Sequence, residues 1–346
     1  MFPFLLRRLP FGLILATVLS CLPGRLAAEL VWSPQTGWRI EGGALAGVTG
    51  SESRNAVELM NKARTAEENG SIHSAISSYQ KVGKKYPNSV YAPEALYRVG
   101  KLRLARKQYI DAFDAFQQVV GRYPNTKRFN EIIGELYRIA SILVDGGRPR
   151  LWGIIPGFTA RSRGIDFLEV VLIDAPYGDY GPLALMTIAR GHLLLKNTED
   201  AINALDRMIN TYPQSLLAPE AYLLIAKANA SLVQGPYYDQ ASTLEAITYY
   251  EDFMILYPSD IKIGEAAKGV DTMKKLLAES KIKIADFYFY KRDNYVAAKV
   301  FYNEAITAYP DSDVAKRAKV MLATVEAKAS GKPVETAPHK KHFWLF

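Results

Sequence analysis

The sequence predicts an all-α fold in which helical hairpins follow one another along the chain. Three recurring features predict it: an aromatic-proline pair, a small residue at a fixed distance before each proline, and a large residue four positions after the small one. The pairs are Tyr86-Pro87, Tyr123-Pro124, Tyr212-Pro213, Tyr257-Pro258 and Tyr309-Pro310, with Ala175-Pro176 as a degenerate sixth member.

The spacing of these prolines sets the length of the repeat. Successive prolines lie 37, 52, 37, 45 and 52 residues apart. These distances fit a helical hairpin of about 34 residues with longer connections and insertions. Proline ends the second helix of each hairpin because it has no backbone N–H to donate. We therefore predict a tetratricopeptide-like helical-hairpin solenoid of about five to six repeats.

Small and large residues recur in register inside each repeat. Alanine lies twelve residues before the proline at Ala75, Ala112, Ala201, Ala246 and Ala298, and a large residue lies eight before it at Tyr79, Phe116, Leu205, Tyr250 and Tyr302. A small residue lets two helices approach closely, and the ring fills the groove between them. The matching small residues of the first helices are Ala63, Gly100, Ala140, Ala189 and Ala226. We interpret all of these as core residues.

First helices are expected over 53–69, 92–107, 129–146, 180–195, 217–233 and 263–291, each followed by a second helix. Together they make up a repeat domain over 53–326. Two insertions interrupt the period, at 147–159 and 232–243, and insertions in repeat proteins often map to binding faces.

The N-terminal segment 1–28 is typical of a secretory signal peptide. Arg7 and Arg8 precede an apolar stretch too short for a permanent membrane span. Two ends compete: Val-Leu-Ser-Cys21 resembles a lipobox, which would place a lipid on Cys21, whereas cleavage after Ala28 would release an unmodified protein. Cys21 is the only cysteine, so we expect no disulfide in the exported chain.

Two further segments flank the repeats. Residues 29–52 contain Trp32 and Trp38, and we interpret them as an extended Trp/Gly-rich linker without strand or helix periodicity, with a docking segment as the alternative. Residues 327–346 are predicted to form a disordered basic-aromatic tail, which either frays or contacts a lipid or a partner.

The charge and the motifs exclude several function classes. The excess of positive charge lies mostly in the signal and the tail, so the repeat body is nearly neutral and nucleic acid is not an expected partner. The four histidines, His73, His192, His339 and His342, share no motif, and no phosphate-binding or nucleophile motif is present. We predict no enzymatic activity, no catalytic residues, no cofactor and no metal site.

Residues 277–298, Tyr302 and the run Tyr309-Pro-Asp-Ser-Asp313 are similar to the last hairpin of one known family. That family is the outer-membrane assembly lipoprotein BamD (ComL) group, and the run Tyr238-Asp-Gln-Ala-Ser-Thr243 resembles it too. The resemblance covers roughly 53–326. It implies a scaffold at the periplasmic face of the outer membrane that binds a BamA-like insertase and unfolded outer-membrane proteins.

The long 29–54 segment, the 147–159 loop and the sixth proline mark depart from this family. An alternative of a different class is therefore a periplasmic tetratricopeptide adaptor for envelope division, polysaccharide export or secretion. In either case we expect the first helices to line a peptide groove. The candidate groove residues are Tyr97, Lys101, Tyr137, Arg190 and Lys227.

Overall fold

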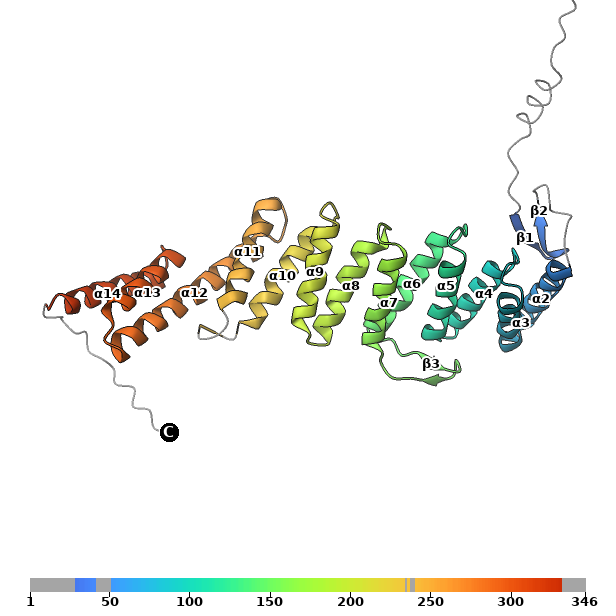
Figure 1. Ribbon diagram of the computed structural model, residues 1–346, viewed down its shortest axis with the longest axis horizontal. Coiled ribbons are helices and arrows are strands. Elements are labelled where there is room, and N and C mark those ends of the chain that lie inside the picture. The colour runs from blue at the N-terminus through green and yellow to red at the C-terminus, as the bar shows by residue number, and fades with distance from the viewer. Residues whose placement is uncertain (1–28, 42–50, 234, 237–239, 332–346) are drawn as a thin grey trace, which may run out of the picture. The chain divides into compact units, whose positions relative to one another are not determined.

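The computed structural model describes residues 29–41, 51–233, 235–236 and 240–331. Cys21 and the tail beyond residue 331 lie outside the described residues. Thirteen helices and two short β-hairpins make up the described part of the chain. The predicted all-α fold with tetratricopeptide-type hairpins is confirmed: six helical hairpins follow one another, and a further helix packs on the last (Figure 1).

The predicted first helices agree with the structure to within a few residues at each end. They are α2 (Ser51–Glu68), α4 (Ala92–Ala105), α6 (Phe129–Val144), α8 (Tyr180–Leu194), α10 (Ala218–Leu232) and α12 (Ile263–Lys291). The second helices are α3 (Ile72–Lys85), α5 (Tyr109–Arg122), α7 (Arg161–Asp174), α9 (Thr198–Thr211), α11 (Gln240–Leu256) and α13 (Tyr295–Ala308), and α14 (Asp313–Ala329) follows them.

The chain divides into two compact units. Of the described residues, unit 1 holds those up to Glu135 together with 148–158, and unit 2 holds 136–147 and those from Thr159 onward. The boundary falls inside α6. Within each unit, helices that are consecutive in the chain pack against each other.

The predicted core positions of the repeats are confirmed. All five second-helix alanines, from Ala75 to Ala298, have no exposed surface, and the large residues four positions later are buried. Gly100 shows why the first helix needs a small residue, because an added Cβ there would lie 2.6 Å from the ring of Phe116. The period in the sequence is thus a packing period.

Two tyrosines of the aromatic-proline pairs have a second role that the sequence did not indicate. The hydroxyl of Tyr123 donates to the carbonyl oxygen of Pro87, one repeat earlier, at 2.6 Å. Tyr212 donates to the carbonyl of Pro176 in the same way. These tyrosines therefore tie the end of one repeat to the end of the repeat before it.

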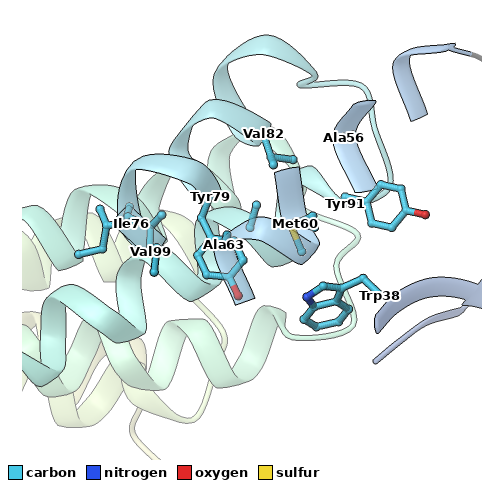
Figure 2. Packing of buried hydrophobic residues seen from close by; sticks show 12 residues of the cluster. Trp38, Ala56, Met60, Ala63, Ile76, Tyr79, Val82, Tyr91 and Val99 are labelled. Carbon is cyan, nitrogen blue, oxygen red and sulfur yellow. The ribbon is translucent and has the colours of Figure 1, made fainter. Parts of the chain in front are cut away.

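The interpretation of residues 29–52 as an extended linker is wrong for its first part. Residues 29–41 form an antiparallel hairpin of β1 (Glu29–Ser33) and β2 (Gly37–Glu41), in which Trp32 pairs with Trp38. Trp38 is only 5% exposed and packs with Met60 and Tyr79 in the first core cluster (Figure 2). The hairpin therefore covers one side of the first repeat, as a terminal cap does in a repeat protein.

The 147–159 insertion contains the second β-hairpin. β3 (Arg150–Leu151) pairs with β4 (Ile155–Pro156) around a turn at Trp152 and Gly153, both of which have positive φ. Its backbone is tied to the end of α4, since Arg150 N donates to the carbonyl oxygen of Lys107 at 2.8 Å.

Candidate polypeptide-binding surfaces

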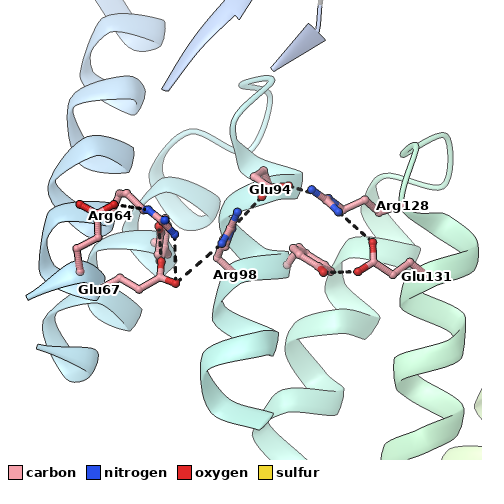
Figure 3. A network of polar contacts seen from close by, with 9 residues as sticks. Arg64, Glu67, Glu94, Arg98, Arg128 and Glu131 are labelled. Carbon is pink, nitrogen blue, oxygen red and sulfur yellow. Dashed lines mark hydrogen bonds and ion pairs between the residues drawn. The ribbon is translucent and has the colours of Figure 1, made fainter. Parts of the chain in front are cut away.

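A chain of ion pairs links the first helices of unit 1. Arg98 lies between Glu67 of α2 and Glu94 of its own helix, with N–O distances of 3.9 and 2.9 Å. Arg128 then joins Glu94 at 3.0 Å to Glu131 of α6 at 2.9 Å (Figure 3). The row therefore presents alternating charges along α2, α4 and α6.

Tyr97 contacts two members of this network, Glu131 and Arg128. Its hydroxyl donates to Glu131, and the Arg128 guanidinium lies 4.6 Å from its ring centroid. Burial, together with the hydrogen bond to Glu131, raises the pKa of Tyr97. Burial acts to raise the pKa of Glu131, but the hydrogen bonds from Tyr97 and Arg128 outweigh it and hold that pKa below its usual value. Glu131 is therefore an anion at neutral pH.

The two candidate groove residues of unit 1 both pair with α6. Tyr97 is only 6% exposed, so it offers little surface to a ligand. The Nζ of Lys101 lies 2.8 Å from Glu135 Oε1. Both side chains therefore hold neighbouring first helices together, and their contact with a peptide stays a prediction.

The three candidate groove residues of unit 2 also pair with polar side chains of neighbouring repeats. The Tyr137 hydroxyl lies 3.3 Å from that of Thr187 on α8, and Arg190 pairs with Asp145 at 3.1 Å. Lys227 pairs with Glu265 of α12 at 2.7 Å. The Arg190 and Lys227 pairs are partly exposed, so a bound peptide could exchange partners with them at small cost. Their role as peptide contacts also stays a prediction.

Unit 1 also contains a basic pocket that the sequence did not predict. It is about 570 Å³ in volume and is formed by α3, α4 and α5, with Leu96 and Val99 among its lining residues. All four charged residues that line it are cations: Lys81, Lys84, Arg103 and Arg122. Ser77, Gln80 and Gln118 add hydrogen-bonding groups. The signal in the sequence was a set of basic residues in the last turns of second helices, which also complement the helix dipole.

The last hairpin of unit 2 contains the residues on which the family resemblance rests. Ala278, Ile282 and Phe289 of α12 are buried against α13 and α14. The Tyr302 hydroxyl donates to Asp286, and the rings of Tyr288 and Phe301 stack at 5.5 Å. The same hairpin leaves Phe287, Tyr290 and Val296 about half exposed or more. It therefore combines a firmly packed core with several exposed apolar side chains.

Two family profiles match the chain. The tetratricopeptide repeat profile matches residues 59–89 and 94–126, and the YfiO profile, described as outer membrane lipoprotein, matches residues 162–339, which is more than half of the sequence. The chain belongs to the YfiO family. The predicted resemblance is confirmed, since curated relatives of this chain include outer membrane protein assembly factors named BamD.

These relatives are distant. The BamD outer membrane protein assembly factor of Caulobacter vibrioides is 24% identical over 127 residues, which covers 37% of this chain and 42% of the relative. That of Xylella fastidiosa is 23% identical over 147 residues, covering 40% of this chain and 50% of the relative. The chain thus spans half or less of the length of the relatives it matches.

Solved structures that resemble this chain include a tetratricopeptide repeat protein from Parabacteroides merdae, with a TM-score of 0.32 and 13% identity over 79% of this chain and 100% of the other. Among the described residues, no helix has both the length and the hydropathy to cross a bilayer.

Proposed function

We propose that this chain is a non-enzymatic scaffold for the assembly of outer-membrane proteins, acting in the periplasm or at the periplasmic face of the outer membrane. The observation that carries the proposal is the YfiO match, which includes the last hairpin with its exposed apolar side chains. A scaffold of this kind acts by holding two polypeptides at once, so it needs two binding surfaces.

Unit 1 supplies the surface for the unfolded outer-membrane protein. The basic pocket holds four cations beside apolar floor residues and neutral hydrogen-bonding groups. Such a pocket suits an extended segment that carries a carboxylate and one or two apolar side chains. Binding there leaves the ion pairs of the first helices intact.

The last hairpin of unit 2 supplies the surface for a BamA-like insertase. Phe287, Tyr290 and Val296 are the apolar side chains that a partner would cover. Aromatic residues at the centre of an interface contribute most to affinity. A lipid on Cys21 would hold the scaffold at the membrane.

Site-specific photo-crosslinking in the native envelope tests this division of roles. A crosslinker at Phe287 is expected to trap the insertase, and one at Lys84 is expected to trap unfolded outer-membrane proteins. Lys85 is exposed but does not line the pocket, so a crosslinker there is the matched control. Recovery of division, polysaccharide-export or secretion proteins instead of an insertase would replace the proposal with the adaptor function.

A charge-reversal pair tests the pocket itself. Lys84→Glu together with Arg122→Glu is expected to weaken binding of an unfolded outer-membrane protein about tenfold or more, because two of the four cations become anions. Lys85→Glu alters the same helix end outside the pocket and should change binding little. Equal binding by both variants would rule out the pocket as the substrate surface.

A further inference from the structure

The β3–β4 hairpin places its apolar side chains in water. Leu151, Trp152, Ile154 and Ile155 are each about half exposed or more, and Trp152 reaches 73%. Phe158, just after the second strand, is 93% exposed. Other strongly exposed apolar residues, such as Leu216 and Ile261, stand singly in turns between repeats, which is common on protein surfaces. A cluster of five in eight residues is not.

The hairpin is fixed in this exposed position. Its turn is closed by Ile154 N donating to Leu151 O at 3.1 Å, and its base by Gly157 N donating to Pro149 O at 2.7 Å. At the turn, Arg106 of unit 1 donates to the carbonyl oxygen of Trp152 at 2.9 Å. The backbone of the apolar tip is therefore preorganised, so little conformational entropy would be lost on binding.

The charged residues of the hairpin itself, and the charged residue Lys107 to which its backbone is bonded, are cations. Arg148 and Arg150 of the hairpin and Lys107 at the end of α4 are exposed. Residues 146–160 contain no aspartate or glutamate. Cations beside an apolar tip complement an anionic lipid surface, where phosphates meet the cations and the tip reaches the acyl region. Tryptophan favours that interfacial depth.

We infer that the β3–β4 hairpin inserts its tip into the surface of an anionic lipid bilayer and so attaches the protein to the membrane at a second point, independent of any lipid on Cys21. The tip is a protruding turn and not a groove, so it fits a deformable surface. The binding free energy combines burial of the Trp152 and Ile154 side chains with attraction of Arg148 and Arg150 to lipid phosphate.

The test uses the full chain with Cys21→Ser, exported and purified, so that no acyl chain contributes. Its flotation with phosphatidylglycerol-containing vesicles is compared with that on phosphatidylcholine alone. We expect binding to the anionic vesicles, about tenfold weaker when Trp152→Ser and Ile154→Ser are combined. Arg148→Gln with Arg150→Gln should weaken binding and remove most of its salt dependence.

Leu216→Ser with Ile261→Ser is the matched control, because those residues are 97% and 96% exposed but solitary. It should bind vesicles as the parent chain does. Unchanged binding by the Trp152/Ile154 variant would overturn the inference. So would a parent chain that does not bind vesicles but loses an envelope protein when the tip is altered, since the tip would then be a protein contact. The assay involves no insertase, so its result is separate from that of the assembly proposal.

Discussion

The two β-hairpins of unit 1 each contain a tryptophan and a glycine with positive φ, but one packs on the first repeat and the other exposes its apolar side chains. Trp38 lies in the second strand of one hairpin and is 5% exposed, whereas Trp152 lies in the turn of the other and is 73% exposed. In the first hairpin Trp38 and Ile40 lie on one face that meets α2, where Trp38 N also donates to Asn61 Oδ1 at 2.8 Å. The second hairpin is tied to the end of α4 by hydrogen bonds of its backbone, at Arg150 N and Trp152 O, and its large apolar side chains are exposed. The difference teaches that a hairpin's role depends on which of its groups contact the body.

The largest expected change in the free energy of unfolding is for truncation of Trp38, and truncation of Trp152 should have almost none. Trp38→Ala should lower the free energy of unfolding of unit 1 by about 3–5 kcal/mol, because it leaves a cavity under the cap. Trp152→Ala should change it by less than about 0.5 kcal/mol. Urea denaturation followed by circular dichroism measures both. A loss of similar size for the two variants would break the comparison.

Substitution of the two hairpin glycines, Gly37 and Gly153, should cause the next largest loss of stability. Gly37 has φ +70°, and a Cβ there would lie 2.6 Å from Asn61 Oδ1. Gly37→Ala should therefore cost about 2–4 kcal/mol, from the left-handed backbone plus the displaced Asn61.

Gly153 has φ +76°, and the three atoms nearest to an added Cβ belong to the guanidinium of Arg106, the end of a flexible side chain that can shift at the expense of its hydrogen bond to Trp152 O. Gly153→Ala should cost about 1–2 kcal/mol, mostly from the left-handed backbone, because the Arg106 hydrogen bond that it weakens is exposed to solvent. Thermal unfolding of the two variants measures the difference, and equal costs would mean that Asn61 does not hold the cap in place.

The Tyr123→Phe variant tests whether the β1–β2 cap unfolds together with the repeats. The change removes the hydrogen bond to Pro87 O and should cost about 0.5–1.5 kcal/mol. If unit 1 unfolds as one body, this variant and Trp38→Ala will lower the same transition and their effects will add, because the two sites share no contact. Two separate transitions would show that the cap opens alone. Tyr177→Phe, at a 93% exposed site in unit 2, is the control.

The smallest effect concerns pH. The pKa of Glu131 is lowered in the folded chain, so its stabilising contribution is present above the unfolded value of about 4.5 and is lost as the pH falls through the lower folded value. Glu131→Gln should therefore flatten the decline of unit 1 stability between neutral and acid pH. The cap, held by apolar burial, should keep the same Trp38→Ala effect at both ends of that range. A Glu131→Gln variant with the parent's pH profile would contradict the lowered pKa.

The repeat core was predictable because its signal is periodic. Alanines such as Ala75 and Ala298 had to be small to let helices approach, and that requirement recurs at every repeat. The cap was missed although Leu30 and Trp32, then Trp38 and Ile40, alternate across a turn. Two strands of five residues are too short for that alternation to stand out beside a helical period.

The candidate groove residues were placed on the correct helices, but their partners were not foreseen. Tyr97 and Glu131 lie 34 residues apart in the chain and meet because the repeats bring equivalent positions together. Sequence spacing predicts that adjacency but not which side chain is turned toward its neighbour.

By itself the sequence determined the helical repeat, its core positions and its family, because these depend on local periodicity and on motifs within single hairpins. Only the tertiary structure decided which polar groups are paired, that Lys81, Lys84, Arg103 and Arg122 share one pocket, and that one tryptophan hairpin is buried while the other is exposed. These outcomes depend on contacts between residues distant in the chain, because the neighbouring groups decide whether a side chain is desolvated and which partner it pairs with.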